Sequence, residues 1–161
     1  MTLTQKPLQR VEALLEPWMK PDKTGRPAGN RLDIWLTADD LLPVVATLVE
    51  DEWGYLAAIT GLDPGVATGE LHVLYHFAEG AAVLTLRVVV PRDAAEVPTI
   101  RPLIPLAAIY EQELSEVLGV AIVGAPARGR LFLPDDWPDG VYPLRKDFQL
   151  EQFNDKEQGG S

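Results

Sequence analysis

The sequence predicts one α+β domain in two layers, a mixed sheet of about four to five strands with helices largely on one face, followed by an extended C-terminal ribbon. The composition supports a single core, because 47% of the 161 residues are hydrophobic and 24% are charged. The apolar patterns follow the order helix, strand, helix, three strands and helix. That order has too few strand–helix alternations for a doubly wound fold, so we expect one domain over residues 1–150.

The first element is a helix expected over residues 4–19. Thr4 can cap its N-terminus, and Pro7 is tolerated in its opening turn. Apolar residues recur at helical spacing along one side of it. A stretch rich in proline, glycine and lysine, residues 20–30, ends the helix, and the core of the domain is expected to follow over residues 31–120.

A short strand around residues 32–36 and a second helix open this core. Thr37 begins the helix, and Asp40 three positions later forms an acidic variant of the capping box. Pro43 stands early enough in the helix to be accommodated. Gly54 breaks the pattern and ends it.

Three strands come next and supply most of the expected sheet. Residues 55–60 predict a buried strand, and residues 70–77 and 82–90 predict two more. The glycine-containing segment 78–80 has the length of a hairpin loop between the last two. Pro91 stops the final strand.

The third helix is expected around residues 106–118, with Gly119 as its C-terminal cap. Its apolar residues fall on one side of the helix, and its acidic residues fall largely on the other. This acidic side is either a solvated surface or a charged docking surface. The carboxylates that could contribute to docking are Glu111, Glu113 and Glu116.

The absence of cysteine excludes several kinds of chemistry from this chain. Disulfides, thiolate zinc sites, iron–sulfur clusters and a cysteine nucleophile are all ruled out. His72 and His76 would lie about 13 Å apart along a strand, too far to hold one ion, and are expected to make local hydrogen bonds. We therefore expect no catalytic residue, no metal site and no cofactor of the chain's own.

The net charge of −10 and the distribution of charge argue against two classes of partner. Nucleic acids and anionic lipid surfaces are bound by clustered lysine and arginine, which the sequence lacks. No run approaches the roughly 20 apolar residues of a membrane-spanning helix. If the protein serves a membrane, we expect it to do so from the aqueous side.

Residues 121–150 are predicted to form an ordered, non-helical ribbon, because its prolines favour extended backbone. Such a ribbon makes few internal hydrogen bonds, so its amides need partners on this domain or on another chain. Both alternatives, a ribbon strapped onto its own domain and a ribbon that docks, are compatible with the sequence. Residues 151–161 are polar and are expected to be flexible. The ribbon residues expected to bind a partner are Asp135, Asp136, Trp137, Tyr142, Arg145, Lys146 and Asp147.

These ribbon residues resemble the signature of one family of respiratory complex I, its hydrophilic C-type NADH-quinone oxidoreductase subunits, which are related to a domain of membrane-bound nickel–iron hydrogenases. The similarity runs from Tyr55 to Phe148 and is sharpest at residues 133–137 and 143–148. The strand Val-Leu-Tyr-His-Phe at 73–77 also resembles the family's strand. The longer spacer after the first motif resembles the hydrogenase-type relatives more closely.

The resemblance implies an accessory, non-catalytic scaffold subunit that docks onto the large catalytic subunit, beside the cluster-bearing small subunit. The parent complex would be an NADH-quinone oxidoreductase or an energy-converting hydrogenase on the cytoplasmic side of the membrane. Iron–sulfur clusters, and a nickel–iron site or quinone, would then belong to partner subunits, through which alone the chain would reach the membrane.

A free-standing enzyme is the alternative that the sequence leaves open. In that hypothesis Glu111, Glu113 or Asp136 would act as surface carboxylates with a bound divalent metal ion.

Overall fold

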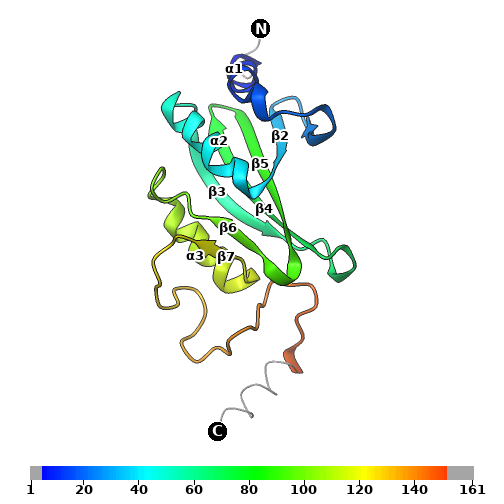
Figure 1. Cartoon of the computed structure of the whole chain (residues 1–161), viewed down its shortest axis with the longest axis vertical. Helices are drawn as coiled ribbons and strands as arrows, with labels where there is room; N and C mark the ends of the chain where they lie inside the picture. The colour runs from blue at the N-terminus through cyan, green and yellow to red at the C-terminus, as the bar shows by residue number, and fades with distance from the viewer. Residues whose placement is uncertain (1–4, 152–161) are drawn as a thin grey trace.

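The computed structural model describes residues 5–151 and confirms the α+β, two-layer prediction. All three helices pack on one face of a mixed five-stranded sheet (Figure 1). The helices are α1 (Gln5–Leu15), α2 (Ala38–Glu50) and α3 (Ala107–Leu118). The strands of this sheet are β1 (Thr24–Gly25), β2 (Arg31–Leu36), β3 (Tyr55–Leu62), β4 (Glu70–Glu79) and β5 (Ala82–Pro91).

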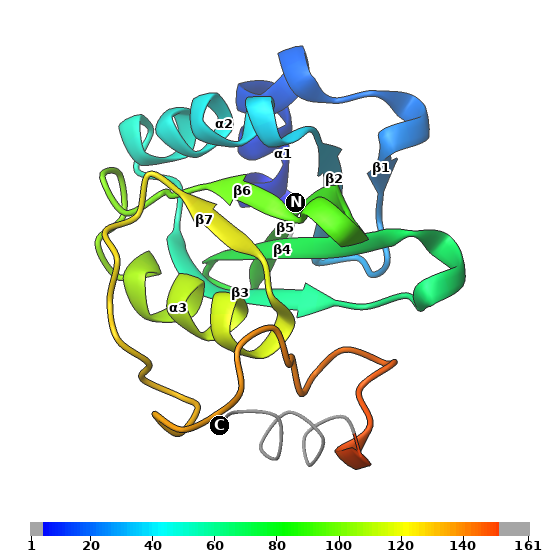
Figure 2. The same ribbon diagram turned by 60° about the horizontal axis from the view of Figure 1, so that its bottom comes forward.

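The strand order is β1-β2-β5-β4-β3, and only β2 and β5 are parallel among its neighbouring pairs. A separate parallel pair, β6 (Glu96–Pro98) and β7 (Ala121–Val123), lies on the helical side of the sheet (Figure 2).

Within residues 5–151 no helix has both the length and the apolar character needed to cross a membrane. Short 3-10 turns occupy Glu16–Trp18, Pro21–Lys23, Val66–Thr68 and Arg92–Ala94.

The core lies between the three helices and one face of the sheet. At its centre Leu86 of β5 is paired with Ile34 of β2 and with Tyr75 of β4, and all three are buried. Because strand side chains alternate between faces, every second residue of these strands joins them. The helix residues buried against this face are Leu8, Val11 and Leu15 of α1, Leu41, Val44, Val45 and Leu48 of α2, and Ala107, Leu114 and Leu118 of α3.

The opposite face of the sheet carries polar side chains that bond to one another. His76 lies 2.9 Å from the Thr60 hydroxyl and 3.1 Å from the Thr85 hydroxyl, and Arg87 lies 3.1 Å from His72. Burial is the main cause that lowers the pKa of His76. The expectation that both histidines make local hydrogen bonds is confirmed.

The N-terminus of α2 is capped as the sequence predicts. The Thr37 hydroxyl accepts a hydrogen bond from the Asp40 amide at 3.3 Å and donates one to the Asp40 carboxylate at 2.8 Å.

Trp53, which is buried after α2, donates its indole N–H to the Pro7 carbonyl at 2.9 Å. This bond joins the segment after α2 to α1 and follows from no local sequence pattern.

Several boundaries differ from the sequence predictions. The strand over 55–62 is an edge strand rather than a buried one, because α3 covers only one side of it and nothing in the described chain pairs with its outer edge. The β4–β5 hairpin has a two-residue loop that begins at Gly80, whose φ of 59° suits a tight turn, so β4 continues through Glu79. The first helix ends at Leu15, and the predicted cap at Thr4 lies outside the described residues.

The ribbon also differs, because its first three residues form β7 and pair with β6. These strands were missed because three residues are too few to show an alternating pattern. The predicted flexible segment lies almost entirely beyond residue 151, outside the described part of the chain.

Candidate functional site

The ribbon is attached to the domain chiefly along α3. Figure 2 shows it leaving β7, passing around α3 and returning below the helix towards its C-terminal end. Two buried carboxylates, one on α3 and one at the end of β3, hold its backbone. The structure therefore realises the alternative in which the ribbon is strapped onto its own domain, and its exposed side chains define the candidate docking surface.

Glu116 of α3 is the first of these carboxylates. It accepts hydrogen bonds from the amides of Leu131, Phe132 and Leu133 at 3.0–3.1 Å, and from the Gln112 side chain at 3.0 Å. Burial opposes ionisation of Glu116, but the bonds from these amides and Gln112 outweigh it and lower its pKa. One ionised carboxylate thus satisfies three consecutive backbone amides in a segment that has no secondary structure to do so.

Asp63, directly after β3, is the second carboxylate and lies in a buried ionic network. Arg92 binds both of its oxygens, at 2.5 and 2.9 Å, and also reaches the Asp147 carboxylate at 2.6 Å. The Lys146 amide donates to Asp63 at 2.8 Å. The Arg92 hydrogen bond is the largest cause that holds the pKa of Asp63 below its usual range, and Asp63 in turn raises the pKa of Arg92.

The segment between these anchors packs against the C-terminal end of α3. Gly119 has a φ of 76°, and a β-carbon at this position would lie 2.4 Å from the Tyr142 ring. Arg145 stacks on the same ring at 4.7 Å and donates to the Leu118 carbonyl at 2.8 Å. The Leu144 amide donates to the Val117 carbonyl at 3.0 Å. Glycine is therefore required where the ribbon touches the helix cap.

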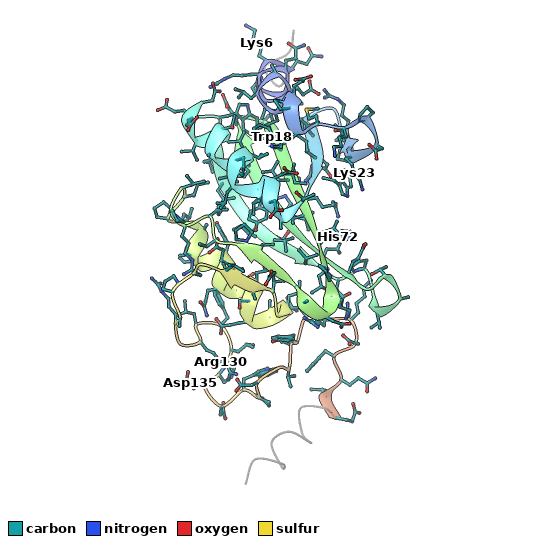
Figure 3. The ribbon with its side chains drawn as sticks, viewed as in Figure 1. Lys6, Trp18, Lys23, His72, Arg130 and Asp135 are labelled. Atoms are coloured by element: carbon teal, nitrogen blue, oxygen red, sulfur yellow. The ribbon has the colours of Figure 1, made fainter. Side chains whose placement is uncertain are left out.

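The turn at 134–137 is organised by Arg130, which sequence reasoning missed. Its guanidinium donates to the carbonyls of Pro134 and Asp135 at 3.1 Å each and to that of Trp137, and it pairs with Asp139 at 2.8 Å (Figure 3 labels Arg130 and Asp135). The Trp137 amide bonds the Pro134 carbonyl at 3.0 Å, so the predicted turn after Pro134 is confirmed.

The aromatic residues of the ribbon stack on each other. The rings of Trp137 and Phe148 lie 6.3 Å apart at 28°, and the Trp137 indole donates to the Val141 carbonyl at 2.9 Å. Val141 is the one strongly buried residue of this stretch, with 5% of its surface exposed. Stacking thus brings the two ends of the segment 137–148 together.

Of the two alternatives for the acidic side of α3, the solvated surface is wrong for two of its carboxylates. Glu111 is fully buried and binds the Ile100 amide at 2.7 Å, the Thr99 hydroxyl at 2.8 Å and Arg101 at 2.7 Å. Like Glu116, it faces chain segments that fold back over the helix, which a helical pattern alone does not reveal. Both residues hold loops of this chain, and their role towards a partner stays a prediction.

The other residues predicted to bind a partner are either half-buried or exposed. Tyr142 and Arg145 are half-buried by the contacts described above, as is Trp137. The exposed apolar side chains beside them are Leu131 (61%), Phe132 (42%), Leu144 (64%) and Leu150 (70%). The exposed charged residues are Glu113, Asp135, Asp136, Lys146 and Asp147.

The three carboxylates of the metal-enzyme hypothesis lie in different surroundings. Within residues 5–151 no group of three or more histidine, aspartate or glutamate side chains is placed to hold a metal ion. Both oxygens of Glu111 are already bound by protein donors, whereas Glu113 is exposed on α3 and Asp136 lies on the ribbon.

Sequence comparison matches residues 34–154 to the family described as respiratory-chain NADH dehydrogenase, 30 Kd subunit. The chain belongs to this 30 Kd subunit family. The match spans β3, β4, β5, α3 and the ribbon, so the resemblance to the C-type subunits of complex I is confirmed. Among solved structures, the archaeal membrane-bound sulfane sulfur reductase, a respiratory membrane complex, contains a chain that matches with a TM-score of 0.77 and 25% identity, covering 96% of this chain and 92% of that one.

Relatives of this 30 Kd subunit family member come from two kinds of complex. Formate hydrogenlyase subunit 5 of Escherichia coli is 35% identical over 73% of this chain, and the NADH-quinone oxidoreductase C subunit of Nocardioides is 34% identical over 78%. The C/D subunit of the Bacteroides thetaiotaomicron enzyme is 32% identical over 65%. The chain spans 21%, 52% and 22% of the lengths of these proteins, respectively. The membrane-bound hydrogenase subunit beta of Pyrococcus furiosus is 40% identical over 47% of this chain. The relatives thus include subunits of complex I-like and hydrogenase complexes.

Glu116→Gln is expected to loosen the ribbon. The substitution removes the charge that three amides share, and hydrogen bonds to a charged group contribute about 1.5–3 kcal/mol. Limited proteolysis of the ribbon should become at least tenfold faster. Glu113→Gln, on the same helix but exposed, is the matched control and should leave the rate unchanged; equal rates for both variants would refute the role of Glu116.

Gly119→Ala should displace Tyr142 from the end of α3, because the added methyl group meets the ring and the positive φ is itself unfavourable. We expect a loss of stability of about 1–3 kcal/mol by urea denaturation. Gly129→Ala is the control, since no atom lies within 4 Å of its added carbon. A stable Gly119→Ala protein would contradict the packing described.

The stability of the fold should depend on acid in a way set by these anchors. Asp63 and Glu116 have pKa values lower in the folded chain than their ordinary 3.8 and 4.5. A carboxyl group whose pKa is lower in the folded than in the unfolded chain stabilises the fold at any pH above the unfolded-chain pKa. This stabilisation is lost as the pH falls through the folded-chain pKa. The free energy of unfolding attributable to them should therefore hold between pH 7 and about 5 and decline below about pH 4. In urea denaturation at a series of pH values, Asp63→Asn and Glu116→Gln should each make this decline less steep than in the wild type. If the free energy of unfolding falls with pH equally steeply in both variants and the wild type, these carboxylates are not the cause.

Proposed function

We propose that this 30 Kd family member is a non-catalytic scaffold subunit of a complex I-like NADH-quinone oxidoreductase or an energy-converting hydrogenase, and that its ribbon docks onto the large catalytic subunit. The observation that carries the proposal is that the ribbon's backbone and its side chains are used differently. Its backbone is fixed by Glu116 and Asp63, while a row of charged and apolar side chains stays outside. A ribbon that is already ordered in the free chain loses less conformational entropy when it binds a partner.

The relatives support the large subunit as that partner. In the Bacteroides thetaiotaomicron protein, the C and D subunits carry one joint name, and this chain matches 22% of its length. It likewise matches 21% of formate hydrogenlyase subunit 5. When one protein contains a region that elsewhere is a separate chain, the two parts usually lie against each other. We infer that this chain contacts the counterpart of the longer remainder.

The proposal assigns the redox groups to other subunits. Iron–sulfur clusters, together with a nickel–iron site or quinone, would be held by the large catalytic and cluster-bearing small subunits. This chain would hold those subunits in register from the cytoplasmic side, reaching the membrane only through them. Its contribution is shape and adhesion, for which the exposed residues Asp135, Asp136 and Lys146 of the ribbon are suited.

Co-purification tests the proposal directly. The tagged chain, extracted from native membranes in mild detergent, should bring down a large and a cluster-containing small subunit. The double substitution Asp135→Lys and Asp136→Lys should lower recovery of the large subunit about tenfold, because it reverses charge on the exposed ribbon. Asp22→Lys with Glu50→Lys, exposed at the other side of the domain, is the matched control. Isolation of the wild-type chain alone would overturn the proposal.

A further inference from the structure

The outer edge of β3 is the longest unpaired strand edge in the described chain. The sheet ends at β3, whose eight residues pair with β4 on one side only. The Tyr110 hydroxyl donates to the Ala57 carbonyl at 2.9 Å, at the irregularity between Leu56 and Ala58. From Ala58 to Leu62, no described residue outside β4 bonds to the strand backbone. A row of amides and carbonyls is therefore left facing outward.

From Ala58 to Leu62 this edge lacks the charge, proline and bulge that usually prevent strand pairing. Folded proteins protect open edges with charged side chains, proline, bulges or a covering segment. The sequence Tyr-Leu-Ala-Ala-Ile-Thr-Gly-Leu of β3 contains no charge and no proline, and its single irregularity precedes Ala58. An uncharged, unprotected edge of five residues is a site that another strand would occupy.

A groove runs beside this edge and fits an extended segment. Its volume is about 410 Å³, and one wall is the side of α3 that carries the buried Leu114 and the half-buried Val117. Leu62 is 43% exposed at the edge, and Leu144, 64% exposed, closes the groove from the ribbon. The groove is therefore open to solvent and walled mainly by apolar side chains.

The charged residues that line the groove favour a strand that carries a basic side chain. Asp63 is neutralised by Arg92, whereas the exposed Glu113 carboxylate has no hydrogen bond or ion pair within residues 5–151. Lys146 stands at the ribbon end. A basic side chain beside Glu113 would complement the wall. A second copy of this chain fits less well, because each copy carries a net charge of −10.

We propose that the edge from Ala58 to Leu62 accepts an extended segment of a partner subunit as a sixth strand. The added strand lies in the groove between α3 and the ribbon, bonds to the outward amides and carbonyls, and places a basic side chain against Glu113. This inference rests on the proposed function, in that the strand comes from a subunit of the same complex, and it identifies a second contact besides the exposed ribbon.

Hydrogen–deuterium exchange of the free chain and of the purified native complex tests this contact. In an antiparallel edge strand about half of the amides bond inward, so the others should exchange quickly in the free chain. In the complex these outward amides of residues 58–62 should slow at least a hundredfold. If they exchange at the free rate while the large subunit is present, the strand proposal falls and the docking proposal stands. If the chain is isolated without other subunits, the docking proposal itself fails.

Substitutions at the edge distinguish strand addition from a general effect of charge. Leu62→Lys introduces an edge charge and should weaken assembly about tenfold, whereas Val66→Lys, which is also exposed but lies in the following turn, should not. Glu113→Lys should weaken assembly more than Glu113→Gln, with Asp22→Lys as the control for net charge. Unchanged assembly of both Leu62→Lys and Glu113→Lys would overturn the proposal. Slow exchange already present in the free chain and lost on dilution would instead indicate pairing between copies and contradict a partner strand.

Discussion

The ionised carboxylates of Glu116 and Asp63 are the constraint on which the C-terminal part of this protein depends. Beyond β7 the proline-rich ribbon has amides but no neighbouring strand to receive them, and leaving them buried without acceptors would be unfavourable. Glu116 receives three consecutive amides, and Asp63 receives those of Gly65 and Lys146 while it is neutralised by Arg92. Two side chains of the domain thereby give an irregular segment a defined course.

This arrangement explains how the ribbon can be both strapped and available. The anchors use backbone amides and buried charge, so they do not consume the side chains that point outward. Leu131 illustrates the division, since its amide is bound by Glu116 while 61% of the residue's surface is exposed. The same course closes the groove beside β3, because Leu144 and Lys146 are held there by contacts to Val117 and Asp63. The ribbon therefore shapes two neighbouring surfaces.

The sequence predicted what local patterns encode and missed what depends on distant contacts. The three helices, the main strands, the cap at Thr37 and the turn after Pro134 follow from periodicity and residue preference. The buried positions of Glu111 and Glu116 do not, because a helical pattern identifies the side that meets the sheet but gives no sign that other loops cover the second side. The Asp63–Arg92 pair joins residues 29 positions apart, and neither lies in a recognisable motif. Arg130, four to nine residues before its partners, was overlooked because a single arginine in a loop is usually solvated.

The docking proposal requires that the ribbon be ordered on its own domain before any partner binds. Amide exchange measured by NMR on the isolated chain tests this order at residues 131–133 and 146. These four amides should exchange far more slowly than those of an unstructured peptide, although they belong to no helix or strand. Exchange at the rates of an unstructured peptide, with the core amides of β4 and β5 still protected, would contradict the role given to Glu116 and Asp63.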